Sequence, residues 1–218
     1  MLTFAEEILL LTLDDKKGAF RPISQEAIRI ALAGALLMEL ALEERIDTDL
    51  KSLMVISTEP TGEPLMDEIL LRLKKSDSQH PVSYWLNEIA WHMGKLREQV
   101  LQSLIKKGVL KIEDRKILWV FARRCYPLID DREVKEVRLR LRELVFNQDI
   151  PDPREAVLIG LLYACNMVDT LFTEQELPEV MPRLTQLAKL DLIGREVDQS
   201  IRDIYSAMTA HNKDRVID

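Results

Sequence analysis

Two long apolar runs constrain the fold of this chain more than any other feature. The first follows Ser24, a residue type that caps helix N-termini, and covers residues 25–44 with alanine and leucine on all sides. The second covers residues 152–172 and opens with an Asp-Pro pair, a strong helix start signal. A helix that is apolar all round is buried. We therefore expect two core helices that pack against each other.

The remaining segments read as amphipathic helices, short strands and turns. A capping box at Thr3 and Glu6 starts the first helix, and Gly108 ends a long helix over residues 82–107. Further helices are expected from residue 65 and over residues 131–146, 178–190 and 193–209, with a strand over 53–57. A hairpin is expected with strands at 109–112 and 117–121 around a turn at 113–116. The pattern predicts one mainly α-helical domain with small hairpins.

The N-terminus carries no secretory signal, because Glu6 and Glu7 stand where a signal peptide has positive charge. The most apolar run is too short for a membrane span and is interrupted by charges such as Arg29. Two cysteines, Cys125 and Cys165, have no CxxC partner and fit a reducing compartment. We expect a cytoplasmic protein whose membrane contact, if it has one, is peripheral.

Charge is distributed unevenly along the chain. Residues 94–142 hold 14 Lys and Arg against 7 Asp and Glu, a balance of +7. The whole chain holds 30 against 37, or −7, so the rest of it sums to −14. A contrast this large indicates a face for a negatively charged partner.

An apolar run lies in the middle of this basic stretch, followed directly by Arg123 and Arg124. It consists of Ile117, Leu118, Trp119, Val120 and Phe121. In a strand, such a run places apolar side chains on both faces, and only one face can reach the protein's own core. We expect Leu118 or Trp119 to be exposed or to lie at a contact between chains. A buried strand beside ordinary solvated helices is the alternative.

A search for catalytic chemistry finds no phosphate-binding loop, dinucleotide fingerprint, serine-hydrolase elbow or zinc-protease motif. Asn166 and Asp169 lie three apart on the second apolar helix, and we interpret them as a hydrogen-bonded pair in the core. We expect no catalytic residue, no metal site and no cofactor, and hence a protein that is not an enzyme. The histidines, which lack metal-ligand spacing, are His80, His92 and His211.

A nucleic-acid partner is a weaker hypothesis. A helix that ends in two lysines before a hairpin also occurs in winged-helix domains, and basic charge suits phosphates. Here the neighbouring helices are too long and apolar, no tight helix-turn-helix precedes the hairpin, and Trp119 suits a wing poorly. The sequence pI is near 5.2. We therefore expect no nucleic-acid binding.

Five stretches of the sequence occur together and in a familiar order. They are LTFAEEILLLTLDDKKG, ALAGALLMELALEERI, EPTGEPLMDEILLRLK, KLREQVLQSLIKKGVL and DPREAVLIGLLYACNMVD. Together they resemble the Golgi phosphoprotein 3 family over residues 2–208, which leaves residues 209–218 as a tail. The resemblance implies one mainly α-helical domain around an apolar four-helix bundle. It also implies a peripheral membrane protein that binds phosphatidylinositol 4-phosphate and, in eukaryotes, holds glycosyltransferases in the Golgi. Without a long polar N-terminal tail, the chain looks more like the prokaryotic branch.

The resemblance further implies a lipid head-group pocket of one tryptophan and three arginines, beside an apolar hairpin that matches residues 109–121. Only Arg97 is retained from this set. The other positions hold Ile23 or Ser24, Ala33 and Gly94. Nearby basic residues are candidate substitutes in the pocket; these are Arg21, Arg29 and Lys95.

We expect a protein that binds anionic phospholipid through its basic face and hairpin, with a membrane-protein client. The alternative is a soluble interaction or self-association module that uses the same hairpin, because strand edges pair readily with other chains. A phosphoinositide is read by several fixed donors at once. With Arg97 alone retained, we expect binding that follows total negative charge, at most a slight preference for phosphatidylinositol 4-phosphate, and a modest loss in Arg97→Ala.

Overall fold

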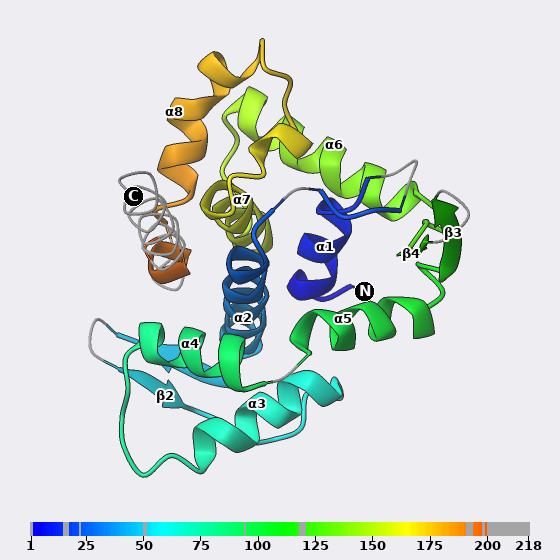
Figure 1. Cartoon of the computed structure of the whole chain (residues 1–218). Coiled ribbons are helices and arrows are strands. Elements are labelled where there is room, and N and C mark those ends of the chain that lie inside the picture. Colours follow the sequence, from blue (N-terminus) through cyan, green and yellow to red (C-terminus); the bar gives the residue numbers. More distant parts are fainter. Residues whose placement is uncertain are drawn as a thin grey trace, which may run out of the picture.

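The computed structural model describes residues 2–14, 18–21, 23–49, 52–93, 95–117, 121–190, 194–197 and 199, with the backbone alone for 115–117 and 121–123. These residues form one mainly α-helical domain with two small antiparallel sheets, as expected (Figure 1). The α-helices are α1 (Phe4–Leu11), α2 (Gln25–Leu42), α3 (Pro64–Lys74), α4 (Val82–His92), α5 (Leu96–Lys106), α6 (Arg132–Asn147), α7 (Pro153–Ala164) and α8 (Leu177–Leu187), with a 3₁₀ helix η1 (Val168–Thr170). The strands are β1 (Ile46–Thr48), β2 (Leu53–Val55), β3 (Glu113–Ile117) and β4 (Phe121–Cys125).

Helix α2 forms the centre of the core, with α1, α4, α5 and α7 packed around it (Figure 1). The Ser24 side chain accepts a hydrogen bond from the backbone N–H of Ala27 and caps the helix. Between Ala27 and Leu40 every α2 residue except Arg29 and Glu39 is buried. The apolar helix bundle is therefore confirmed, and Arg29 is the one exposed side chain in this part of α2, because Glu39 is only 12% exposed.

A buried ion-pair cluster joins α1, α2 and α7. The Arg154 guanidinium donates to Glu39 Oε1 and to Glu7 Oε2, each at 3.0 Å. It also lies 4.3 Å from the centre of the Phe4 ring. Burial raises the pKa of Glu7, and the neighbouring Arg154 opposes this rise. The Arg154 cluster (Arg154, Glu7, Glu39 and Phe4) thus fixes the start of α1 against the bundle.

The prediction of a single helix over residues 82–107 is wrong. The chain instead forms α4 and α5, with a break at residues 93–95. Lys95, just before α5, has a φ of 62°, which lies in the left-handed region that a right-handed helix cannot contain. The apolar periodicity continues on both sides because both helices pack on α2, so the pattern does not reveal the break.

The helix expected over residues 153–172 is also shorter than expected. Helix α7 ends at Ala164, and Asn166 follows with a φ of 55°, the left-handed conformation that often ends a helix. Asn166 and Asp169 are both exposed, so the hydrogen-bonded core pair expected for them is wrong. Asp169 instead faces Arg21, whose Nη1 lies 3.5 Å from its carboxylate.

The hairpin forms with a different register from the one expected. Residues 113–116, expected to be a turn, belong to β3, which pairs with β4 from Glu113–Cys125 to Ile117–Phe121. The segment 113–116 has none of the glycine, proline or asparagine that favours a turn. The apolar run therefore passes from one strand to the next and is not one strand with two apolar faces. Its central residues Leu118, Trp119 and Val120 lie outside the described part of the chain.

The other elements agree with expectation in type. Helices α1, α3, α6 and α8 form close to their expected positions, and both N-terminal capping boxes, at Thr3 and Asp152, are present. The strand expected over 53–57 is shorter and pairs with β1, a partner that the sequence pattern did not reveal. Most of the helix expected over 193–209 lies outside the residues that the structure describes. In the described segments, no helix is long and apolar enough to cross a bilayer.

An ion pair joins α6 to the segment that precedes α8. Arg142 donates to both carboxylate oxygens of Glu176, at 2.7 and 3.2 Å, and its guanidinium lies close to the Phe146 and Phe172 rings. The hydrogen bond from Arg142, followed by one from the Thr173 backbone, lowers the pKa of Glu176 from 4.5 to about 2. Because the folded-state pKa is depressed, the stabilisation is complete above the unfolded pKa and is lost as the pH falls towards 2.

We expect Glu176→Gln to be less stable than the wild type near neutral pH, since the neutral amide cannot replace the ion pair. This deficit should shrink as the pH falls from 4.5 towards about 2, where Glu176 becomes protonated. Urea unfolding at several pH values measures it, with Glu174→Gln, an exposed neighbour, as the control. A deficit that stays constant down to low pH would contradict this assignment.

Candidate functional site

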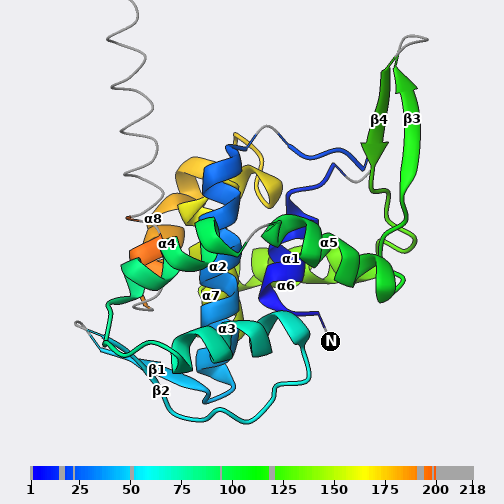
Figure 2. The same ribbon diagram turned by 60° about the horizontal axis from the view of Figure 1, so that its bottom comes forward.

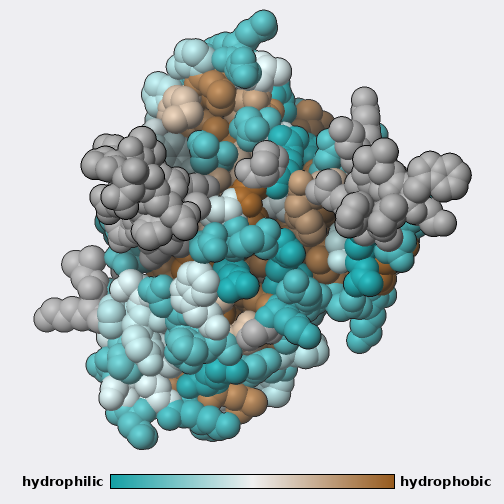
Figure 3. Space-filling view, in the orientation of Figure 1, coloured by the Kyte–Doolittle hydropathy of each residue, from teal (hydrophilic) through white to brown (hydrophobic). Residues whose placement is uncertain are grey.

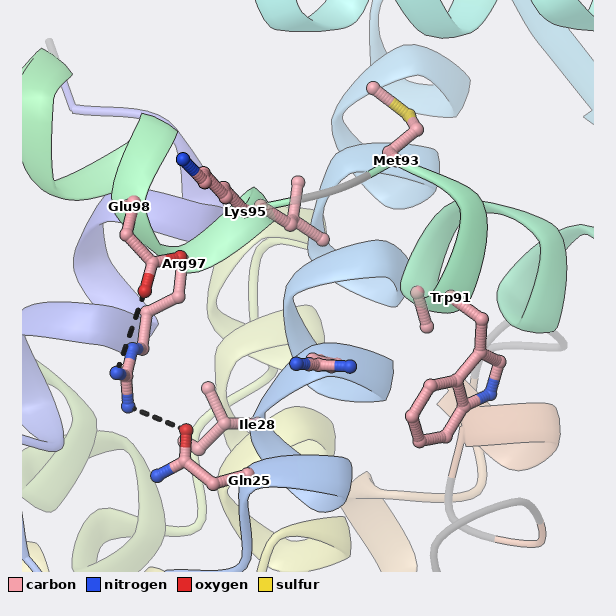
Figure 4. A pocket seen from close by; sticks show the side chains of 10 residues that line it. Gln25, Ile28, Trp91, Met93, Lys95, Arg97 and Glu98 are labelled. Atoms are coloured by element: carbon pink, nitrogen blue, oxygen red, sulfur yellow. Dashed lines mark hydrogen bonds and ion pairs between the residues drawn. The ribbon is translucent and has the colours of Figure 1, made fainter.

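A small cavity opens where α2, α4 and α5 meet (Figure 4). Its volume is about 80 Å³. One water molecule occupies about 30 Å³ in the liquid, so the cavity has room for two or three waters or for one small oxyanion such as a phosphate group. The polar and aromatic side chains on its wall are Gln25, Arg29, Trp91, Lys95, Arg97 and Glu98.

Three basic residues line this cavity for separate structural reasons, and Figure 4 shows the Lys95 side chain pointing away from Arg97. Arg29 lies on the exposed side of an otherwise buried helix. Lys95 precedes α5 at the break after α4, and Arg97 lies in the first turn of α5. The N-terminus of α5 itself faces the cavity, and helix N-termini attract anions through their free N–H groups and the helix dipole. The arrangement therefore suits a negatively charged group.

Arg97 is held in place by its neighbours. Its Nη1 donates to Gln25 Oε1 at 2.8 Å, and its Nη2 lies 3.7 Å from Glu98 (Figure 4). The guanidinium also lies 4.8 Å from the centre of the Phe20 ring. These contacts fix the plane of the guanidinium before any ligand arrives, which reduces the entropy cost of binding.

Trp91 supplies an aromatic wall beside Arg29. The Arg29 guanidinium lies 5.3 Å from the centre of the indole, within the range of a cation–π contact. Trp91 Nε1 donates to Asn87 Oδ1 at 3.3 Å, so the ring is oriented from its own helix. Trp91 could not be identified from the sequence, because its place on the cavity wall depends on how α2, α4 and α5 meet in space. The one sequence signal for it was that Trp91 lies outside the apolar stripe formed by the buried residues of that helix.

The other residues expected near a pocket lie elsewhere. Arg21 is not on the cavity wall and faces Asp169 instead. Ala33 is completely buried inside the bundle, where no side chain can reach a ligand. Gly94 lies outside the described residues. Arg29 and Lys95 are therefore the candidate substitutes that share a cavity with Arg97.

The β3–β4 hairpin projects from the helical body (Figure 2). It points to the side on which the N-terminal end of α2 lies, which is also the end that lines the cavity. Its base is attached to the body through the Tyr126 N–H, which donates to the Gly18 carbonyl at 2.7 Å. Arg124 is exposed, whereas the structure gives only the backbone for Ile117, Phe121 and Arg123.

A larger groove of about 780 Å³ lies between α1, α3 and α5. It contains the nearly buried carboxylate of Glu6, which already accepts hydrogen bonds from Ser103, Lys107 and the Thr3 backbone. The Lys107 ammonium also forms an ion pair with Glu63, whose Oε1 lies 2.9 Å from Lys107 Nζ. Lys107 is therefore paired with two carboxylates, while Lys95 and Lys106 also line the groove.

The described residues offer little to other chemistries. No three His, Cys, Asp or Glu side chains among them gather as metal ligands. Burial raises the pKa of the Cys165 thiol to about 12, so it stays protonated and is a poor nucleophile at neutral pH. Within this part of the chain, anion binding is thus the best-supported chemistry.

The fold and cavity define a class: a mainly helical protein with a small cavity lined by basic residues and a projecting hairpin. The family profile of Golgi phosphoprotein 3 (GPP34) matches residues 4–204, and the chain belongs to this family. A curated relative, vacuolar protein sorting-associated protein 74 of Eremothecium gossypii, is 29% identical over 170 residues. The match covers 68% of this chain and 50% of the relative, so the chain spans about half the length of that protein.

Proposed function

We propose that this protein is a non-enzymatic, peripheral membrane protein that binds anionic lipid, with the lipid phosphate in the cavity between α2, α4 and α5. One observation carries the proposal: Arg29, Lys95 and Arg97 line a single cavity of phosphate size at a helix N-terminus. Phosphatidylinositol 4-phosphate is the lipid that the family resemblance favours. We further propose a cytoplasmic location at a membrane surface and a membrane-protein client.

The charge distribution along the chain supports binding to an anionic membrane. The chain is acidic overall at −7, yet residues 94–142 sum to +7. Each Lys or Arg close to an anionic surface contributes about 1 kcal/mol to binding, and this attraction is screened within a Debye length. On a membrane the protein would therefore present residues of this basic stretch, which contains α5, and keep its acidic remainder away from the lipid.

We expect the protein to pellet with anionic vesicles at low salt and to release them as salt rises. The Debye length falls from roughly 30 Å at 0.01 M to about 10 Å at 0.1 M, which weakens the summed attraction. Sedimentation with phosphatidylcholine vesicles of graded phosphatidylserine content measures this. A folded sample that fails to pellet with anionic vesicles at low salt would refute the proposal.

A second candidate function is self-association or protein binding through the hairpin. In the described part of the chain β3 pairs with β4 alone, so the sheet has two outer edges, and the hairpin projects from the body (Figure 2). Unpaired strand edges are templates for pairing with another chain. The measured oligomeric state separates this candidate from lipid binding.

We expect Leu118→Ser combined with Trp119→Ser to weaken membrane binding or self-association more than it weakens folding. Both residues connect β3 to β4 and lie outside the described residues, so the expectation rests on the apolar sequence of the connection. Vesicle pelleting, light scattering and thermal unfolding should be measured on the same sample. If the double variant unfolds, the connection is part of the core and this prediction is wrong.

A further inference from the structure

We infer that the exposed aromatic face of α4 is a second membrane-contact surface, at which Tyr84 and Trp91 enter the interfacial region of an anionic bilayer. This inference rests on the proposed lipid-binding function and adds a contact that is independent of the hairpin. It assigns a role to two large aromatic side chains that are exposed and not packed in the core.

The helix has two distinct sides. Trp85, Leu86 and Ile89 are buried against the bundle. Tyr84 and Trp91 lie seven residues apart, which is about two helical turns, so they share one side of the helix. They are 43% and 42% exposed, respectively. Two large aromatic rings on one side of a helix form a stripe that the bundle does not cover.

Both rings are held in fixed orientations. The Tyr84 ring stacks on His80, with ring centres 3.8 Å apart, and meets the edge of Trp85. The Trp91 indole is oriented by its hydrogen bond to Asn87 Oδ1. Rigid aromatic side chains lose little conformational entropy on binding, and they present apolar ring surface together with a polar atom.

The chemistry of the stripe favours a bilayer as its partner. Tyr and Trp concentrate at membrane–water interfaces, where their rings meet the acyl boundary and their polar atoms stay hydrated. Trp91 also lines the basic cavity and contacts Arg29, so the aromatic surface is continuous with the proposed phosphate site. Basic and aromatic side chains side by side are typical of surfaces that lie on anionic lipid.

The surroundings of the stripe agree with this assignment. Its acidic neighbour on the helix, Glu88, lies 3.9 Å from Arg72 and 3.0 Å from His92, which carries a positive charge only when it is protonated. The negative charge that would repel anionic lipid is therefore partly compensated. Figure 3 shows surface of intermediate hydropathy over α4, next to strongly hydrophilic surface.

A single-tryptophan protein tests the inference directly. The chain has three tryptophans, so Trp85→Phe with Trp119→Phe leaves Trp91 as the one reporter. We expect its emission to shift to shorter wavelength on phosphatidylcholine–phosphatidylserine vesicles, and lipids brominated near the head group to quench it. Pelleting without a shift or quenching would overturn the inference and leave the proposed function standing. Failure to pellet at low salt would overturn both.

Variants give an independent readout. Tyr84→Ser with Trp91→Ser should weaken vesicle partitioning by about tenfold or more through the lost apolar contact, while the salt dependence keeps its slope because no charge is removed. The control is Leu71→Ser with Leu139→Ser, which removes leucines that are 57% and 58% exposed on α3 and α6. Equal losses in both variants, each folded by thermal unfolding, would overturn the inference.

Discussion

Replacing Arg154 by alanine is expected to lower the free energy of unfolding by about 3–5 kcal/mol, the usual loss when one partner of a buried ion pair is removed. Arg154 is 16% exposed and compensates two carboxylates, Glu7 and Glu39, which are 7% and 12% exposed. Without the guanidinium both carboxylates remain buried without their main partner. Urea unfolding at neutral pH measures the loss.

The loss should depend on pH with a defined sign. Burial already raises the pKa of Glu7 above its usual value of 4.5 while Arg154 is present. Removing Arg154 takes away the positive charge and the hydrogen bond that most strongly oppose this rise. A carboxyl group with a raised folded-state pKa binds a proton more strongly when folded, so its destabilisation is relieved as the pH falls through that pKa. The deficit of Arg154→Ala should therefore shrink on mild acidification.

The matched control is Arg132→Ala. Arg132 also pairs with a carboxylate, that of Asp130 at 2.5 Å, but its side chain is 88% exposed. Exposed pairs contribute little, because water solvates the remaining Asp130 carboxylate after Arg132 is removed. Comparable losses in the two variants, or a loss in Arg154→Ala that does not respond to pH, would show that the Arg154 cluster is not the anchor inferred here.

The second large effect concerns the cavity. Arg29→Ala combined with Arg97→Ala should lower the affinity for vesicles containing phosphatidylinositol 4-phosphate by roughly two to four decades. Each charge-assisted hydrogen bond to the phosphate contributes on the order of 1.5 to 3 kcal/mol, and two of them are lost. Arg97→Ala alone should lose less, because Arg29 and Lys95 still line the cavity.

A control must remove the same charge from residues of the basic stretch 94–142 that do not line the cavity. Arg132→Ala with Lys135→Ala removes two positive charges from α6, where they pair with Asp130 and Asp131. This variant should lose only the nonspecific attraction, which depends on summed charge and not on geometry. The difference between the two double variants then measures the specific contribution of the cavity.

Much of the fold was predictable because local signals and burial agree. The capping boxes at Thr3 and Asp152, the all-apolar α2 and the amphipathic α6 follow from residue spacing. The break before α5 was missed, although the sequence has a glycine, Gly94, just after the last residues of α4, and glycine is the residue type that most often follows a helix end. Because α4 and α5 both pack on α2, the apolar periodicity continues on both sides of the break.

The candidate site was predictable in part. The family resemblance pointed to Arg97, and closeness in sequence to the family positions at Ala33 and Gly94 pointed to Arg29 and Lys95. Trp91 and Gln25 were missed because their place on the cavity depends on how α4, α5 and the start of α2 meet in space. The hairpin register was missed because a charged segment was interpreted as a turn.

One comparison tests the proposed phosphate site most directly. The sequence, with Arg97 alone retained from the family set, predicts binding that follows total charge. The structure places Arg29 and Lys95 on the same cavity as Arg97, so the proposed site predicts that the wild type prefers phosphatidylinositol 4-phosphate over phosphatidylserine in vesicles of matched total charge. That preference should disappear in Arg29→Ala with Arg97→Ala and persist in the α6 control. Equal binding of both lipids by all three folded proteins would contradict the site.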